Sequence, residues 1–590
     1  MTGPDPSDLL ATWPLLSLMW LTPAAGALLI WFLPWPRLAR WVPPLSLAVA
    51  LVLALVIVGR FDPSRAGFQM VEQATWIPSL NVHYLIGLDG ISVLFPPLTL
   101  LLFLGASVAS WTGVHSLRRL HDSLLLLLAS AMLGIFCAMD LILFFLCWEL
   151  TLIPLYFLIS LWGPGPHRRY AAVKYSLFML AAGVPLLFGF ILLAFNHAQA
   201  LGLALPAGLS WDYRDLLATP LAPTLQTSVF LLLFLGFAVK TPVFPLHTWL
   251  PVVAMEGPAA VAALMTGLKL GAYGLIRFAL PLAPVAAQEF HWLLAGLGTL
   301  GLLYGALAAL AQTNLRRLLA YASMSHVGLV LLGLASFSLA GIQGAVFQLL
   351  NFTLVAGGLF LLTRFLSRRL GSTDLISLGG AARGLPLLAA FFFFLSLASL
   401  GIPGTAGFPA EFLLLMSALR GHLGAGIAAL FAMVFAAAYV LHSYRRVFFG
   451  ACPTRALTRA QDLRPRELLV ALAFSLPLLV AGLYPALVLD TIKVSSHQWV
   501  ERLASPLQNP DLGLALATPG CPPGGGGGDG AAVAPRIGRH QGGLRLSRGS
   551  IAFNPRVKPF WLETPVARPT RRPGGVAGDW RWPPGSRPGG

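Results

Sequence analysis

Long apolar stretches follow one another along this chain, and they restrict its fold more than any other feature. They repeatedly reach the roughly 20 residues that a helix needs to cross about 30 Å of hydrocarbon. Of the 590 residues, 57% are hydrophobic and 10% are charged. Because lipid satisfies no backbone hydrogen bond, such stretches must be helical. The sequence therefore predicts an all-α polytopic membrane protein with about 14 transmembrane helices.

The first apolar stretch, at 13–33, is predicted to remain as a membrane helix, because no basic segment precedes it as in a cleaved signal peptide. The predicted spans centre near residues 23, 50, 101, 130, 150, 183, 233, 268, 300, 325, 355, 400, 435 and 477.

Basic residues mark one side of the membrane. Arginine pairs such as Arg118 with Arg119 and Arg316 with Arg317 fall in alternate short loops between the predicted spans. A Lys/Arg excess in short loops marks the cytoplasmic side, so we expect the N-terminus outside, in the periplasm. These loop residues account for the net charge of +17, so a nucleic-acid partner is not needed to explain it.

Ionisable residues recur inside the apolar stretches. A charge at bilayer depth costs at least a few kcal/mol, so such residues usually face a bundle interior and line an ion path. The pattern predicts a proton or cation conductor rather than a structural scaffold. These residues are Glu149, Lys240, Lys269, His326 and Glu411.

Two predicted spans are interrupted by proline and glycine, at 240–245 and 401–409, each beside a charge. Broken helices survive at membrane depth where protein or water satisfies the freed backbone groups. Lys240 lies 91 positions after Glu149, and Glu411 lies 85 positions after His326. This spacing predicts two five-helix repeats, the second inverted in the membrane.

The predicted organisation has five parts. Residues 1–120 hold helices 1–3, 121–283 the first repeat with helices 4–8, 284–450 the second repeat with helices 9–13, and 451–508 helix 14. Residues 509–590, rich in Gly, Pro and Arg, read as a disordered basic tail.

No cofactor or metal site is expected in this chain. The four cysteines lack C-x-x-C spacing, and no glycine-rich nucleotide-binding loop follows a predicted strand. Arg277 lies near a span end, where we expect it to anchor the helix at the interface, and Asp89 is expected at a loop edge.

Six segments, in order, resemble the antiporter-like subunits of proton-pumping NADH:quinone oxidoreductase, respiratory complex I. The resemblance runs from about residue 85 to 489, and Glu411 in place of a lysine favours the branch known as subunit M or chain 4. The segments are GIFCAMDLILFFLCWELTLIPLYFL (134–158), KTPVFPLHTWLP (240–251), LKLGAYGLIRF (268–278), AYASMSHVG (320–328), SLASLGIPGTAGFPAEF (396–412) and YRRVFFG (444–450).

Several positions depart from that family's usual pattern. Val252 and Ala254 stand where the family commonly has Asp and His, Asn314 where it has Asp, and Phe352 where a His is usual. These changes leave the buried Glu and Lys set complete. With fewer polar side chains between Lys269 and Glu411, His326 and ordered water are expected to bridge that gap.

The resemblance implies a role for each candidate, and each also has a structural alternative. Glu149 and Lys240 form either a switching pair or a fixed buried ion pair. Lys269 serves as a proton relay, since a buried amine without an acid releases its proton readily. His326 relays protons or bonds across helices, His247 extends the relay or caps the broken helix, and Glu411 is an exit-side carboxylate or a satisfied interior acid.

The resemblance further implies a non-redox, proton-translocating subunit of an enzyme complex in the bacterial inner (plasma) membrane. Its partners would be protons, the lipid bilayer and the other membrane-arm subunits of the complex. The NADH, FMN, iron–sulfur and quinone sites are expected in partner subunits and not in this chain. The alternatives are a subunit of a multi-subunit cation/proton antiporter and a subunit of a membrane-bound hydrogenase.

Overall fold

The computed structural model describes residues 14–450 and 461–508, with side chains described to residue 504. Within these ranges, twelve helical segments are long and apolar enough to cross a membrane. They comprise α2 (Leu15–Phe32), α3 (Pro36–Ala39) with α4 (Val42–Arg60), α6 (Arg118–Cys137), α7 (Leu141–Leu150) with α8 (Leu152–Trp162), α9 (Arg168–Ala200), α11 (Pro223–Lys240), the segment Ala259–Leu282, α17 (His291–Leu310), α18 (Leu315–Leu334), α19 (Leu339–Leu370), α22 (Leu423–Phe448) and α23 (Pro465–Leu483).

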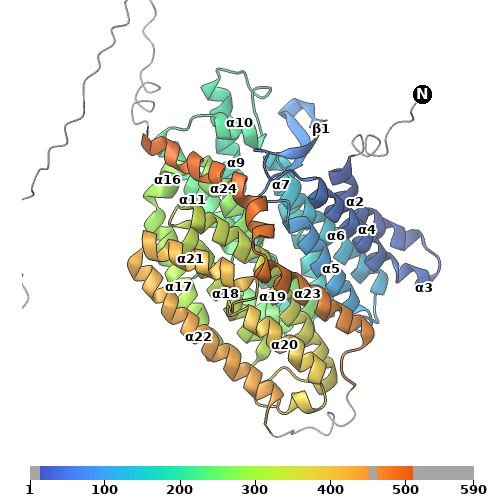
Figure 1. The fold of residues 1–590 in the computed structure, drawn as a ribbon. Coiled ribbons are helices and arrows are strands. Elements are labelled where there is room, and N and C mark those ends of the chain that lie inside the picture. The colour runs from blue at the N-terminus through green and yellow to red at the C-terminus, as the bar shows by residue number, and fades with distance from the viewer. Residues whose placement is uncertain (1–13, 451–460, 509–590) are drawn as a thin grey trace, which may run out of the picture. The chain divides into compact units, whose positions relative to one another are not determined.

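Two shorter apolar helices, α5 (Phe95–Ser110) and α20 (Pro386–Ala398), accompany them. The helical membrane class is confirmed (Figure 1). Every predicted centre lies on a helix except two: that near 268 falls in a break within the segment Ala259–Leu282, and that near 400 falls in the break after α20. The count of fourteen spans and the inverted repeats remain predictions. The other helices are α10 (Tyr213–Ala218), α12 (Trp249–Glu256), α16 (Pro284–Glu289), α21 (Gly407–Gly421) and α24 (Ala486–Gln508).

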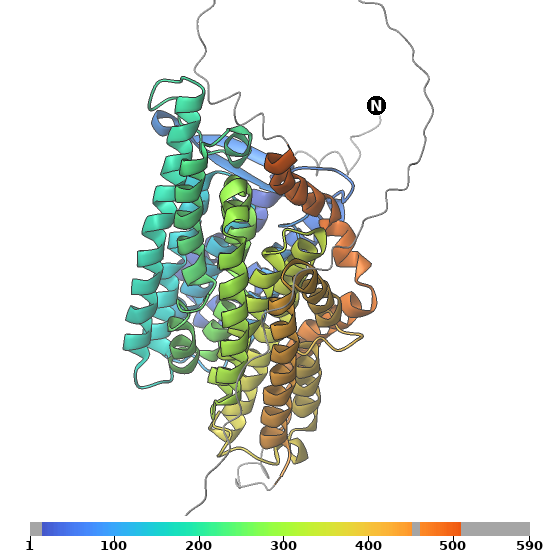
Figure 2. The ribbon, with the colours of Figure 1, turned by 90° about the vertical axis from the view of Figure 1, so that its left-hand side faces the viewer.

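A β-hairpin that the apolar pattern did not reveal lies between α4 and α5. Its strands β1 (Gln69–Ile77) and β2 (Val82–Leu88) pair antiparallel, with Ala74 opposite Tyr84. The turn contains Asn81 in the left-handed conformation, φ 53°. The hairpin and α24 lie at the same end of the bundle (Figure 2), where Ser495 of α24 accepts a hydrogen bond from the Gly90 amide at 3.0 Å. This end is called the hairpin end below.

The centre of the bundle is formed by α19 and the segment Ala259–Leu282, whose side chains are buried by their neighbours. By contrast, α2, α4, α22 and α23 expose many large apolar side chains. Apolar exposure on one face of a long helix is what contact with lipid tails requires. Three of the ionisable candidates are buried inside the protein: His326 on α18, Lys269 in the central segment and Glu411 on α21.

Both predicted breaks are present. The helix α11 ends at Lys240 and α12 begins at Trp249, while α20 ends at Ala398 and α21 begins at Gly407. A third break, which carries no proline, divides the central segment into α13 (Ala259–Gly267) and α14 (Leu270–Gly274). After α14 the chain continues as a π-helical turn, Leu275–Ala279, and α15 (Leu280–Leu282). Lys269 has non-helical backbone angles, φ −95° and ψ 59°, at this break.

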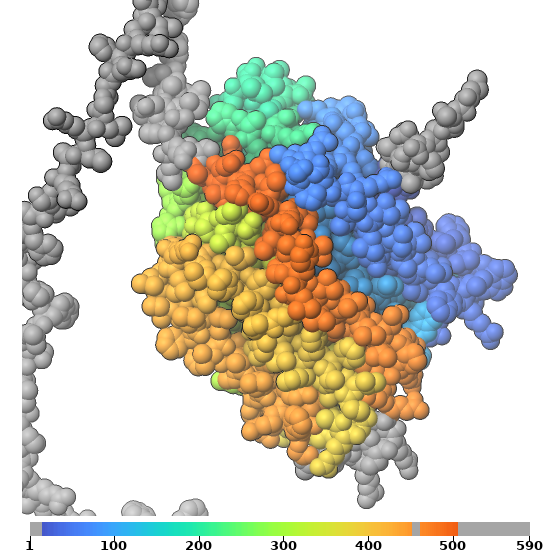
Figure 3. Space-filling model, in the orientation of Figure 1, coloured from blue at the N-terminus to red at the C-terminus, as the bar shows by residue number. Residues whose placement is uncertain are grey.

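The segment predicted as helix 14 contains two helices in its described part, α23 and α24. The second, drawn in orange-red, crosses the surface of the bundle near the hairpin (Figure 3). Its Trp499 donates a hydrogen bond to the carbonyl of Ile276 in the π-helical turn at 2.9 Å. The predicted tail, 509–590, lies outside the described residues.

Candidate functional site

Glu149 and Lys240 approach from two different helices. Glu149 is near the end of α7, whose N-terminus is capped by Asp140, and Lys240 is the last residue of α11. The Lys240 amine donates to the Trp148 carbonyl at 3.1 Å and to Thr151 Oγ1 at 2.9 Å. It also lies 3.8 Å from the centroid of the Trp148 ring, a cation–π contact. The amine thus binds groups on both sides of Glu149 in the chain.

The Glu149 carboxylate itself lies against the backbone of Gly183 in α9, where any side chain would collide with Glu149 Oε1. Among ion pairs of the described residues, with N···O up to 4.0 Å, Glu149 and Lys240 are not joined. The structure therefore holds the predicted pair in its separated arrangement.

Lys269 is 5% exposed and lies at the break between α13 and α14. Its amine donates to the carbonyl of Thr266 and to the hydroxyl of Ser323 on α18. In the described part of the chain, no carboxylate lies within ion-pair distance of this amine. Lys269 is thus a buried amine held by neutral oxygen atoms, as its sequence surroundings predicted.

His326 and Glu411 meet through a residue that sequence analysis missed. Gln348 of α19 donates to Glu411 Oε1 at 3.1 Å, and its Nε2 lies 3.2 Å from His326 Nδ1. His326 Nδ1 itself lies 3.3 Å from Glu411 Oε1, and Asn351 donates to Gln348 Oε1 at 3.1 Å. A neutral amide deep in an apolar helix was the available signal, because buried polar groups need partners.

Glu411 repeats the arrangement of Glu149 on a second helix. Its Oε2 lies against the backbone of Gly401, which has φ +62° and belongs to the second predicted break. A side chain there would be strained and would strike the carboxylate. Both carboxylates, of the half-buried Glu149 and the buried Glu411, thus occupy space left by a glycine.

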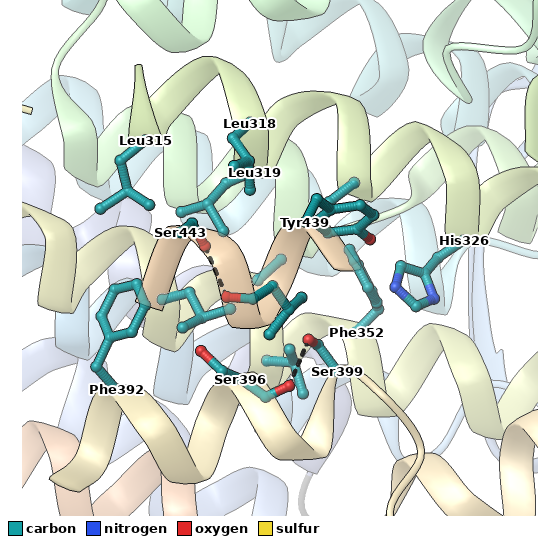
Figure 4. A pocket seen from close by; sticks show the side chains of 15 residues that line it. Leu315, Leu318, Leu319, His326, Phe352, Phe392, Ser396, Ser399, Tyr439 and Ser443 are labelled. Atoms are coloured by element: carbon teal, nitrogen blue, oxygen red, sulfur yellow. Dashed lines mark hydrogen bonds between the residues drawn. The ribbon is translucent and has the colours of Figure 1, made fainter. Parts of the chain in front are cut away.

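Phe352 separates Lys269 from the His326 cluster. Its ring centroid is 5.4 Å from the Lys269 amine and 4.5 Å from the His326 ring. Figure 4 shows Phe352 and His326 on the wall of a small cavity that also includes Ser396, Ser399 and Tyr439. The cavity measures about 20 Å³, and a second of equal size touches His326 and Glu411. Each has room for about one water molecule.

His247 follows the first break and is 4% exposed. Its ring packs on Phe244 and Tyr304 at centroid distances of 5.7 and 5.2 Å. Its Nδ1 is buried without a hydrogen-bond partner among the described residues. The structure therefore surrounds His247 with aromatic rings, and within the described part of the chain no hydrogen bond joins it to Lys240 or Lys269.

Arg277 and Asp89, which the sequence predicted near a span end and at a loop edge, form a buried ion pair. Asp89 does lie at a loop edge, directly after β2. Arg277 Nη1 donates to Asp89 Oδ2 at 2.8 Å, and Nη2 donates to Oδ1. The guanidinium packs between Phe68, Tyr213 and Tyr273, at 5.2 to 5.8 Å from their ring centroids. Arg277 is thus paired with an acid that lies 188 positions away in the chain.

Comparison with known proteins agrees with this geometry. Residues 138–436 match the family described as NADH:quinone oxidoreductase/Mrp antiporter, TM. The chain is 39% identical to NAD(P)H-quinone oxidoreductase chain 4 1 of a Synechococcus strain, over 84% of this chain and 94% of that protein. It is 37% identical to NADH-quinone oxidoreductase subunit M of Pseudomonas aeruginosa, over 84% of this chain and 98% of that protein.

Solved structures give the same result. A chain of respiratory complex I from Thermus thermophilus with bound NADH superposes with a TM-score of 0.75 at 32% identity, covering 83% of this chain and 99% of that chain. A chain of the Mrp complex from Dietzia sp. superposes with a TM-score of 0.70 at 23% identity, covering 85% and 100%. The Mrp likeness concerns the fold alone.

The broken helices and the buried Glu, Lys and His side chains define an antiporter-like membrane subunit. The chain belongs to the NADH:quinone oxidoreductase/Mrp antiporter family. Its similarity along nearly the whole length of subunit M and chain 4 relatives confirms the branch predicted from the sequence.

Proposed function

We propose that this chain carries protons across the membrane as subunit M of a bacterial NADH:quinone oxidoreductase. The observation that supports this best is the series of three buried polar groups, each beside a helix break. They are Glu149 with Lys240, Lys269 with Ser323, and His326 with Gln348 and Glu411.

The first step is a movement of Lys240. When the amine leaves Trp148 and Thr151 for Glu149, the two charges approach to ion-pair distance. Two unit charges about 4 Å apart interact by roughly 4 kcal/mol at an effective dielectric of 20. An energy of this size corresponds to roughly three pKa units. In this proposal, the displacement of the Lys240 charge changes the electrostatic potential at Lys269 and so changes its proton affinity.

The second step takes the proton from Lys269 towards Glu411. Ser323 contacts the Lys269 amine, whereas Phe352 lies between that amine and His326. Water in the cavities beside His326 can bridge this gap once the ring turns aside, since each cavity, although mainly apolar, has His326 and serine side chains that can bind a water molecule. His326 and Gln348 then pass the proton to Glu411.

Electron transfer belongs to partner subunits in this proposal, so NADH, FMN, iron–sulfur clusters and quinone bind there. The other membrane-arm subunits are the immediate neighbours, the bacterial inner membrane is the location, and the N-terminus faces the periplasm. The hairpin end is then periplasmic, and the arginine-rich loops at the other end are cytoplasmic.

The test is Glu149→Gln in the complete complex, reconstituted into vesicles. Gln retains the shape of the side chain but cannot pair with Lys240, so NADH-driven proton flux should fall at least tenfold. Glu289→Gln, at an exposed position, is the control. Full proton flux in an assembled Glu149→Gln complex would reject the role.

A further inference from the structure

A cavity of about 460 Å³ lies at the opposite end of the bundle from the hairpin, and none of the proton-carrying residues reaches it. The ends of α5, α13, α18 and α19 form its walls. Its polar side chains include Arg316, Arg364, Ser110 and Ser367. The described residues that line it include no Asp or Glu.

Arg316 contributes a buried charge, and no carboxylate of the described residues lies within ion-pair distance of it. It is 6% exposed, its Nη2 donates to the Gly257 carbonyl, and its Nε has no hydrogen-bond partner among the described residues. The nearby acid Glu256 instead accepts a bond from the His167 amide at 2.8 Å. An unpaired buried guanidinium is costly, so the site favours an anion.

Arg364 brings a second positive charge to the same cavity. Its guanidinium packs directly on Gly113, where a side chain would collide with Nη2. Among the described residues, Arg364 also has no carboxylate within ion-pair distance. Two guanidinium groups on one cavity wall match the oxygen atoms of a phosphate, which arginine binds with paired N–H donors.

More arginines surround the adjoining loop 111–114. Arg40 and Arg118 donate to the Trp111 carbonyl at 2.7 and 2.8 Å, and Arg466 donates to Thr112 Oγ1 at 3.2 Å. These acceptors are uncharged, so they leave most of the positive charge uncompensated. Asp122 pairs with Arg118 at 3.2 Å. The field at this end of the bundle therefore attracts anions.

Exposed tryptophans near the cavity indicate its depth in the membrane. Trp35 and Trp41 are 62% and 55% exposed, and the Trp41 ring lies 4.7 Å from that of Trp111. Exposed tryptophans at span ends occupy the headgroup region of a bilayer. Basic pockets between helices at this depth are suited to anionic lipid headgroups.

We propose that the cavity binds the phosphate of an anionic phospholipid between Arg316 and Arg364. The lipid's phosphate supplies the charge that the described residues lack, and its acyl chains extend along the helices. This site is independent of the proton path, so either proposal can fail alone.

The test uses the purified complete complex, washed with detergent and then supplied with phosphatidylglycerol, phosphatidylcholine or inorganic phosphate. Native mass spectrometry counts the retained lipid, and thermal unfolding reports the protection that each addition gives. The wild type should retain phosphatidylglycerol and gain stability from it alone. Arg364→Gln should bind it about tenfold more weakly, since one charge-assisted interaction is lost.

Arg364→Lys keeps the charge without the paired donors and should bind at an intermediate level, while Arg420→Gln, at an exposed position, should match the wild type. Arg316→Gln is a second variant and should also bind phosphatidylglycerol more weakly. If Arg316→Gln does not assemble, Arg364→Gln alone decides the outcome. Equal retention by Arg364→Gln and the wild type would overturn the proposal. Equal protection by inorganic phosphate would overturn it in favour of a free-anion site.

Discussion

Gln348 donates a hydrogen bond to Glu411 at 3.1 Å, and this amide joins a carboxylate on α21 to an imidazole on α18. The three side chains come from three helices, yet all are buried. The acid beyond the second break is therefore part of a fixed hydrogen-bonded group. Its geometry depends on a neutral residue.

Gln348→Leu should lower proton flux about tenfold while the complex assembles, because a buried carboxylate that loses its donor costs 1–3 kcal/mol or more. The control is Gln343→Leu, on the same helix at a partly exposed position. Flux is measured in vesicles at matched complex levels. Equal flux in both variants would show that Glu411 works without the amide.

Lys269→Arg should strongly reduce pumping, although it preserves the positive charge. A guanidinium stays protonated in proteins and cannot release the proton that a relay must pass. Lys493→Arg, at an exposed position of α24, is the matched control. If Lys269→Arg pumps at the wild-type rate, a fixed charge is sufficient at this position.

Gly183→Ala should impair pumping without preventing assembly. The added methyl group would occupy the space that the Glu149 carboxylate fills, so the acid must move relative to Lys240. Gly296→Ala is the control, because nothing lies within 4 Å of the position of its new methyl group. The measurement is proton flux per NADH oxidised, and an unchanged ratio for Gly183→Ala would contradict the prediction.

Arg277→Met should destabilise the assembled complex by about 3–5 kcal/mol, because it leaves Asp89 charged and buried. The double variant Arg277→Met with Asp89→Leu should recover much of that loss, since no unpaired charge remains. Thermal unfolding of the purified complex gives the comparison. A double variant no more stable than Arg277→Met would show that the pair itself is not what stabilises this region.

The sequence predicted those parts of the site that depend only on residues close to one another in the chain. Proline and glycine revealed the breaks after Lys240 and after Ala398, and the rarity of charge in apolar spans revealed all five ionisable candidates. The break at Lys269 has distant causes. Its freed carbonyls are satisfied by Lys269 itself, Ser323 and Thr353, and the last two lie 57 and 86 positions from the carbonyls to which they donate.

Pairings between distant segments were missed for the same reason. Arg277 meets Asp89 only because the hairpin folds against the π-helical turn, and no local pattern encodes that contact. The sequence prediction of Gln348 failed because only ionisable residues in the apolar spans were taken as candidates, whereas neutral amides also donate hydrogen bonds to buried acids. The repeats, the span count and the roles of the individual residues remain predictions.

The Phe352 ring lies 5.4 Å from the Lys269 amine and 4.5 Å from the His326 ring, and an aromatic ring carries no protons. In the proposed path from Lys269 to His326, this ring would therefore block proton transfer until it turned aside. Each elementary charge that flows back across a membrane releases about 2.3 kcal/mol per 100 mV. A path closed in this way would prevent that loss, so the stored gradient would be kept while no electrons drive the pump.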